Sequence, residues 1–224
     1  MNEIEYGRRS CYLTERLGVS LARRFKIGRL HIHGVNLLGA QRTMSEQALR
    51  QVGEVSVGVS GRRHALVLVS PLRRARETVE LAGLGGRAEV DPDLAEWDYG
   101  DYEGLTTPQI REKAPGWLIF RDGCPGGETP EQVAARADRV IARARAVEGD
   151  VALFAHGHVF RVLVARWVGL FASAGQHFLL DTGTLSVLGY YRGIPAVKTW
   201  NAPLVGYVPP PAQRELEAMA RPSR

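Results

Sequence analysis

Hydrophobic positions along the chain form short apolar runs that alternate with longer stretches of helical periodicity. The short runs have the length and apolar content typical of strands: residues 29–33, 64–69, 151–155 and 185–191. The longer stretches place apolar residues three and four positions apart, as helices do: about 44–58, 71–83, 130–147 and 159–171. Strands that alternate with helices predict an α/β fold, a three-layer sandwich with a mostly parallel sheet and helices on both faces.

Helix-start signals support three of these helices. Ser70-Pro71 and Thr129-Pro130 each put a capping residue before a proline at the first helical position. Thr43 and Glu46 have the spacing of a capping box.

Residues 91–129 interrupt the alternation, because they are rich in glycine, proline, aspartate and aromatic residues. We interpret them as an insertion folded over the active-site edge of the sheet. The predicted organisation is an N-terminal extension (1–27), one α/β domain (28–208) and a C-terminal tail (209–224).

Composition narrows the function classes. The chain has 224 residues, of which 45% are hydrophobic, and a formal net charge of +5. Its basic residues are scattered on apparent polar helix faces, and no basic block alternates with aromatics, so nucleic acid is not an expected partner. No apolar run approaches the roughly 20 residues that span a bilayer, so no membrane association is expected. The first residues lack the apolar segment of a secretory signal, which predicts a cytoplasmic protein with reduced Cys11 and Cys124.

Polar residues follow three of the predicted strands. His33-Gly34 ends the first, "SPLRRARET" follows the second, and His156-Gly157-His158 follows the third. Ligands of open α/β sheets bind beyond the carboxyl ends of the strands. A glycine after each histidine lets the backbone approach a ligand closely. The pattern predicts one site at this edge.

Other interpretations of these residues remain open at this point. A histidine at a strand end is often structural, and Arg73, Arg74 and Arg76 could form a solvated helix face. Two i, i+2 histidine pairs, His31 with His33 and His156 with His158, could also hold a metal ion together with Glu96.

Four segments resemble one known family: "SPLRRARETVEL", "LAEWDYGDYEGLT", "CPGGETPEQVAARADRV" and "FAHGHVFRVLVARW". They are similar in order and spacing to the histidine phosphatase superfamily, the phosphoglycerate-mutase-like fold, and most closely to its small bacterial acid phosphatases. The resemblance covers about residues 28–200. It implies a phosphohistidine intermediate, and it implies neither a metal nor a cofactor.

The resemblance also implies roles for individual residues. His33 matches the nucleophile, and a neutral imidazole is a competent nucleophile near pH 7. Arg74 and His156 match groups that hold phosphate oxygens, and Glu96 matches the acid that protonates the leaving oxygen. The expected substrate contacts are Gly34, Asn36, Trp117, Gly157 and His158.

The segment "LHIHG" departs from the family pattern. The family places arginine directly before the nucleophilic histidine, whereas this chain has Ile32, and Val35-Asn36 replace the usual Glu-Thr after Gly34. Losing one charge-assisted donor of this kind costs on the order of 10²–10³ in rate.

Two functions follow. The first is a phosphoric monoester hydrolase acting on a small phosphorylated metabolite. The alternative is a diverged member with weak or no phosphatase activity, which transforms or binds a less charged small molecule. A homodimer is compatible with either.

Overall fold

The computed structural model describes residues 27–34, 64–181 and 183–203, and for residues 27–34 and Pro203 it describes the backbone alone. Four predicted features lie outside these residues: the helix over 44–58, Asn36, nearly all of the N-terminal extension, and the C-terminal tail.

The described residues form one six-stranded sheet with the order β3-β2-β4-β1-β5-β6. The first four strands in this order run parallel, β5 runs antiparallel to β1, and β6 runs antiparallel to β5. The mostly parallel sheet is therefore confirmed. The strands are β1 (Ile27–Gly34), β2 (His64–Val69), β3 (Ala88–Val90), β4 (Gly149–Ala155), β5 (Thr184–Tyr191) and β6 (Ile194–Pro203).

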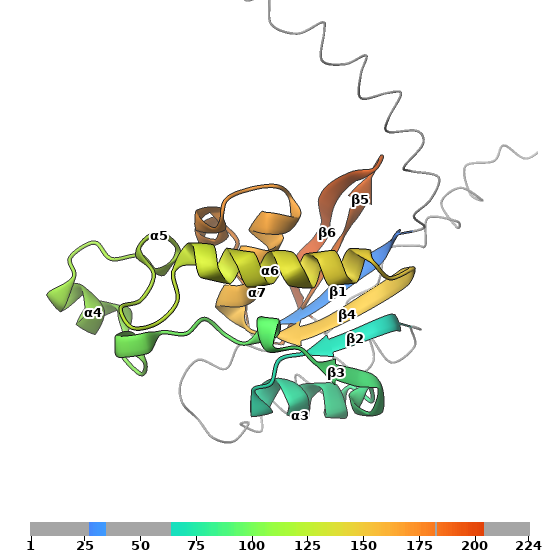
Figure 1. Cartoon of the computed structure of the whole chain (residues 1–224), viewed down its shortest axis with the longest axis horizontal. Helices are drawn as coiled ribbons and strands as arrows, with labels where there is room; N and C mark the ends of the chain where they lie inside the picture. Colours follow the sequence, from blue (N-terminus) through green and yellow to red (C-terminus); the bar gives the residue numbers. More distant parts are fainter. Residues whose placement is uncertain (1–26, 35–63, 182, 204–224) are drawn as a thin grey trace, which may run out of the picture.

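Helices cover both faces of the sheet, with α3 on one face and α6 and α7 on the other (Figure 1). The described helices are α3 (Arg73–Leu81), α4 (Thr107–Lys113), α5 (Ile119–Asp122), α6 (Pro130–Arg145) and α7 (Gly157–Trp167).

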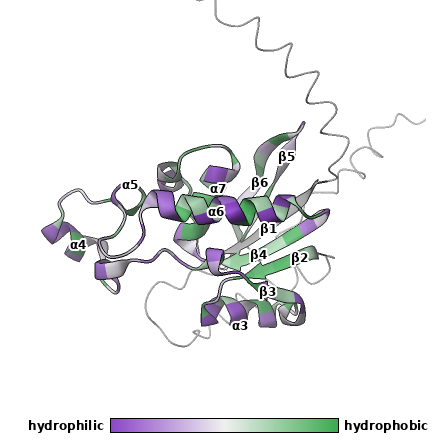
Figure 2. Cartoon of the chain, in the orientation of Figure 1, coloured by the Kyte–Doolittle hydropathy of each residue, from purple (hydrophilic) through white to green (hydrophobic). Residues whose placement is uncertain are grey.

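Alternate residues of the central strands belong to different hydrophobic clusters. Val69 and Phe154 pack in the cluster that includes α3, whereas Leu68 and Leu153 pack in the cluster with α6 and α7. This is the two-residue period of a strand that is buried on both faces. Figure 2 shows the result, with hydrophobic residues along β2 and β4 and mixed character on the outer helices.

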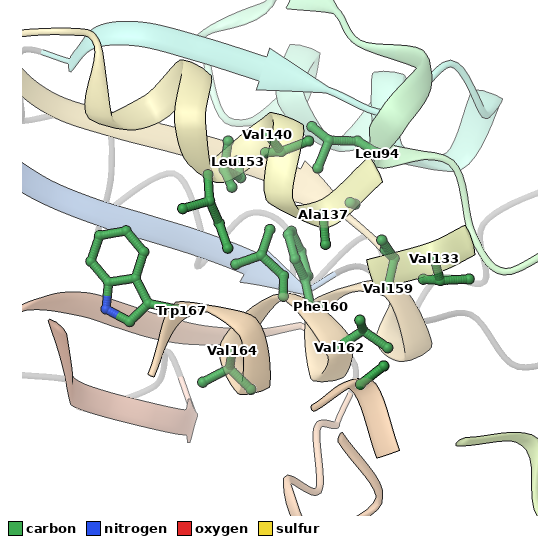
Figure 3. Packing of buried hydrophobic residues seen from close by; sticks show 14 of the residues in the cluster. Leu94, Val133, Ala137, Val140, Leu153, Val159, Phe160, Val162, Val164 and Trp167 are labelled. Carbon is green, nitrogen blue, oxygen red and sulfur yellow. The ribbon is translucent and has the colours of Figure 1, made fainter. Parts of the chain in front are cut away.

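The larger cluster lies between α6, α7 and the sheet. Val133, Ala137 and Val140 repeat along one side of α6 and are at most 1% exposed. They pack near Phe160 of α7 and Leu153 of β4 (Figure 3). Each large apolar side chain buried in this way contributes about 1.5–3 kcal/mol relative to an exposed one.

The start of α6 follows a predicted signal, and the end of α7 has a local cause in the structure. Thr129 caps α6 through a capping box with Gln132, in which the Gln132 amide donates to Thr129 Oγ1 at 3.3 Å and the Thr129 amide donates to Gln132 Oε1 at 2.8 Å. Helix α7 ends before Gly169, whose φ is +81°. The Leu170 amide donates to the carbonyl of Ala165, and the Gly169 amide donates to that of Arg166, which is a Schellman motif. The helix therefore stops at Trp167, short of the predicted residue 171.

The start predicted for α3 is wrong by two residues. The helix begins at Arg73 after an extended Leu72, and Ser70 is not its capping residue. The Ser70 hydroxyl instead accepts from the Leu72 amide at 3.2 Å and bonds to His156. Ser70 thus bonds to a histidine at the end of the neighbouring strand β4 and does not cap the helix.

Residues 91–129 form the predicted insertion, with α4, α5 and 3₁₀ turns in place of regular strands. The insertion extends on the side of the sheet toward which the β2 and β4 arrowheads point (Figure 1). Strands β3 and β6 were not predicted. β6 follows a tight turn in which Arg192 and Gly193 both have positive φ, as a type I′ hairpin requires.

Candidate active site

The carboxyl ends of β1, β4 and β2 lie side by side. Gly34 pairs with Ala155 in register, and His33 pairs with Phe154. On the far side of β4, the Ser70 amide donates to the Phe154 carbonyl at 2.9 Å. The backbone therefore brings His33, Ser70 and His156 to the ends of three adjacent strands, as the sequence predicted for the two histidines.

His156 is fully buried at the junction between β4 and α7. Arg74 Nε donates to His156 Nδ1 at 3.1 Å, and His156 Nε2 lies 2.7 Å from Ser70 Oγ. An arginine Nε–H can only donate, so Nδ1 accepts and carries no proton. In the neutral ring the proton therefore lies on Nε2 and is donated to Ser70. Arg74 and His156, predicted to act together, are in direct contact.

Glu96 reaches the first turn of α7 from the insertion. Its Oε1 accepts from the amides of Trp97 and Val159 at 2.9 and 3.1 Å, and its Oε2 accepts from the amide of His158 at 3.3 Å. Amides at a helix N-terminus lack intrahelical partners and favour a carboxylate there. Because Oε2 accepts only one long bond from these amides, it is the carboxylate oxygen with capacity to carry or take a proton.

His158 belongs to a ring cluster at the base of the insertion. Its ring packs against those of Trp97, Tyr99 and Phe120, with centroids 5.4–6.5 Å away. Its Nδ1 lies 2.6 Å from the Tyr99 hydroxyl. Burial lowers the pKa of His158, opposed by the Glu96 carboxylate. Burial, together with nearby carboxylates, raises the pKa of Tyr99 well above its usual value. The phenol therefore stays protonated and donates to a neutral imidazole.

Gly157 and Trp117, two of the expected substrate contacts, lie in different parts of the structure. Gly157 is the buried first residue of α7, directly after His156. Trp117 lies within the insertion, where its Nε1 donates to the Gly123 carbonyl at 2.8 Å and its ring packs edge-on against Tyr102. The indole hydrogen bond and the ring contact of Trp117 are with the insertion, and the ring also packs against the larger hydrophobic cluster. Its role in substrate binding stays a prediction.

The alternative metal site would use the histidines at the strand ends together with Glu96. Within the described ranges, no three histidine, cysteine, aspartate or glutamate side chains are grouped as a metal site would require. The side chains of His31 and His33 fall outside that description, so the metal hypothesis that includes them stays untested.

No helix in the part of the chain that the structure describes has the length and apolar character needed to cross a membrane.

Cys124 is a buried free thiol whose pKa is raised to about 11 by burial and by neighbouring carboxylates. At neutral pH it is protonated and therefore a poor nucleophile.

Comparison with known proteins places this site in a family. The model of the histidine phosphatase superfamily (branch 1) matches residues 41–203. An acid phosphatase of Mycobacterium tuberculosis is 42% identical over 162 residues, which are 71% of this chain and 77% of the relative.

Two solved structures share the fold. The product of an open reading frame of M. tuberculosis has a TM-score of 0.71 and 33% identity, covering 79% of this chain and 98% of its own. The complex of a mycobacterial glucosyl-3-phosphoglycerate phosphatase with inorganic phosphate has a TM-score of 0.66 and 28% identity, covering 79% and 97%.

The match to the family model begins after "LHIHG", the segment that departs from the family pattern. It includes Arg74, Glu96 and His156, which the structure brings to the carboxyl edge of the sheet. The chain belongs to the histidine phosphatase superfamily, branch 1, and is a phosphatase-type enzyme.

Proposed function

We propose that this chain hydrolyses phosphomonoesters of small metabolites through a phosphohistidine formed on His33. The observation that carries the proposal is the contact between Arg74 and His156 at the end of β4, next to the end of β1 where His33 lies. A related phosphatase that holds inorganic phosphate has the same fold.

In the first step an imidazole nitrogen of His33 attacks phosphorus, and the bond between phosphorus and the ester oxygen breaks. Glu96 must enter this step protonated, and it gives that proton to the departing alcohol. In the second step water attacks the phosphohistidine, Glu96 takes a proton from that water, and the phosphorus–nitrogen bond breaks. Phosphate leaves, and His33 and Glu96 return to their starting states.

Arg74 would hold the phosphoryl oxygens through its Nη groups. His156 orients Arg74 in this arrangement, and it would hold an oxygen itself by exchanging its contact with Arg74 or Ser70 for one with the phosphoryl group. Catalysis of phosphoryl transfer depends mainly on positioning and on charge stabilisation around these oxygens. The Nε bond to His156 orients the Arg74 guanidinium, whose Nη groups have the fork geometry that suits phosphate. His156 is itself held by Ser70, so the pair is preorganised.

Ile32 favours a second candidate, a diverged member with weak turnover or with a less charged ligand. In the sheet, Ile32 pairs with Leu153 of β4 and Ser186 of β5, one residue before His33. An isoleucine at this position supplies no donor to a phosphoryl oxygen.

A phosphate-release assay over a panel of phosphomonoesters, run with the native chain and with His33→Ala, separates these candidates. We expect release by the native chain and none by the variant. We also expect a phosphoenzyme trapped in the native chain to be acid-labile and base-stable, as phosphohistidine is. Release that persists in His33→Ala would refute the nucleophile. A folded native chain with no release from any ester would favour the diverged function.

A further inference from the structure

Arg136 of α6 binds the backbone that carries Glu96. It is a buried arginine whose side chain is 8% exposed. Its Nε and Nη2 donate to the two carboxylate oxygens of Glu128 at 2.7 and 2.9 Å. Its Nη1 donates to the carbonyls of Asp93 and Ala95 at 2.8 and 2.6 Å. Because the guanidinium is a rigid planar fork, these four bonds fix both carbonyls relative to α6.

Glu128 holds the same backbone on the other side of Glu96. The Glu128 carbonyl accepts from Trp97 Nε1 at 2.9 Å, and Glu128 Oε2 accepts from the Asp98 amide at 2.9 Å. The Glu128 amide donates to the Asp98 carbonyl at 3.0 Å. The ion pair therefore contacts the backbone on both sides of Glu96, at the Ala95 carbonyl before it and at the Asp98 amide after it.

The Arg136–Glu128 ion pair connects the backbone around Glu96 to the same helices that position His156. Helix α6, which carries Arg136, packs on α7 (Figure 3), and α7 begins directly after His156. Glu96 in turn accepts from two amides of the first turn of α7. A displacement of the Ala95 carbonyl would move the Glu96 carboxylate relative to His156 and the end of β1.

We propose that the Arg136–Glu128 pair is a positioning device for Glu96 and sets how effectively this carboxyl group protonates the leaving alcohol. The inference rests on the role of Glu96 in the proposed function. Arg136 and Glu128 touch the backbone around Glu96 and are positioning residues, not catalytic ones.

The next arginine on the same helix supplies a matched control. Arg139 also makes a bidentate bond to a carboxylate, that of Asp93, at 2.8 and 2.6 Å. Its side chain is 62% exposed, and it binds a side chain three residues before Glu96, not the backbone beside it. An exposed pair of this kind contributes little to geometry or stability.

The test compares two esters that differ in their need for an acid. The p-nitrophenolate of p-nitrophenyl phosphate can leave as the anion. The glycerol oxygen of β-glycerol phosphate must be protonated as it leaves. Because kcat/KM reports the steps up to the first irreversible one, it covers substrate binding and departure of the alcohol and excludes hydrolysis of the phosphoenzyme. We expect Arg136→Lys and Glu128→Gln to lower kcat/KM for β-glycerol phosphate by about 10–10²-fold, the scale of a displaced catalytic group. For the same two variants, kcat/KM for p-nitrophenyl phosphate should change by less than about threefold. Arg139→Lys should have kcat/KM values close to those of the native chain for both esters.

Glu96→Gln separates a failure of this inference from a failure of the proposed function. If Glu96→Gln shows no selective loss on β-glycerol phosphate, the acid role itself is refuted, and the positioning role with it. Suppose that Glu96→Gln loses activity selectively on β-glycerol phosphate. If Arg136→Lys and Glu128→Gln then lower kcat/KM equally for the two esters, or change it for neither ester, only the positioning role is overturned. If Arg136→Lys does not fold, Glu128→Gln decides by the same criterion. In the Glu96→Gln background, adding Arg136→Lys should cause no further selective loss.

Discussion

His158→Gln tests the conclusion that a neutral imidazole lies buried beside Glu96. At pH 7.5 the native ring accepts from the Tyr99 hydroxyl at 2.6 Å and is surrounded by three aromatic rings. A glutamine that fails to reproduce this contact leaves a buried phenol without its acceptor, which costs about 1–3 kcal/mol. The free energy of unfolding of the variant should be lower by that amount at this pH.

The difference between the two proteins should narrow as the pH falls. Burial lowers the pKa of His158 in the folded protein below its reference value of 6.5. Below that value the unfolded chain takes up a proton that the folded native protein does not, so the native protein loses stability as the medium becomes acidic. The variant has no imidazole at this position and does not share this loss. Each pH unit below 6.5 lowers the free energy of unfolding of the native protein by at most about 1.4 kcal/mol through this group. The difference between the two free energies should therefore shrink by up to about 2 kcal/mol between pH 7.5 and pH 5.

Urea unfolding of both proteins at pH 7.5, 6.5, 5.8 and 5.0 measures this difference directly. The other titrating groups are common to both proteins and largely cancel when one free energy is subtracted from the other. Glu96 and Arg161, whose charges act on the pKa of His158, are retained in both proteins. His177→Gln, at an exposed position, serves as the control for loss of an imidazole. A difference that stays constant or widens on acidification would refute a neutral buried His158.

Three further predictions concern the site. Ile32→Arg should raise turnover of a simple aryl phosphate by up to about 10²-fold, as one added cationic donor would, and His33→Ala should abolish that gain. A folded Ile32→Arg protein that releases no phosphate would favour the diverged function. Activity should survive a strong chelator, because no step proposed here uses a metal. Loss with chelator and recovery with zinc or manganese would instead support the metal hypothesis. Trp117→Ala should lower the melting temperature, because its indole bond to Gly123 and its packing on Tyr102 are lost. If the relative kcat/KM values among substrates stay unchanged, Trp117 anchors the insertion and does not select the substrate.

The sheet was predictable where burial on both faces leaves a clear signal. The run over 64–69 matches β2 at both ends, and its last three residues are buried, as a strand covered on both faces requires. The meeting of Arg74 and His156 was also predictable, since parallel strands bring their carboxyl ends to one edge. Strand β6 carries Pro195 and a residue with positive φ, Asn201, and such interruptions hide an edge strand from a periodicity argument.

The hydrogen-bond partners inside the site were not predictable. Ser70 reads as a helix cap because a proline follows it, but the chain stays extended to Leu72 and the hydroxyl turns to His156. Tyr99 carries no sequence signal that would pair it with His158. Both pairings depend on how the insertion and the strand ends fold together, and no local pattern encodes that.

The arginines of α6 show how far a local pattern reaches. In sequence they lie on the polar side of an amphipathic helix, and the expected interpretation is a solvated face. For Arg136 that interpretation is wrong, because its side chain is buried against the carbonyls of Asp93 and Ala95 and the carboxylate of Glu128. An arginine can be buried only where carboxylates and carbonyls satisfy its donors. Those acceptors come from the insertion, which is irregular and therefore invisible to periodicity. The same irregularity requires an external support if Glu96 is to act at a fixed point, and a buried ion pair on a rigid helix provides one.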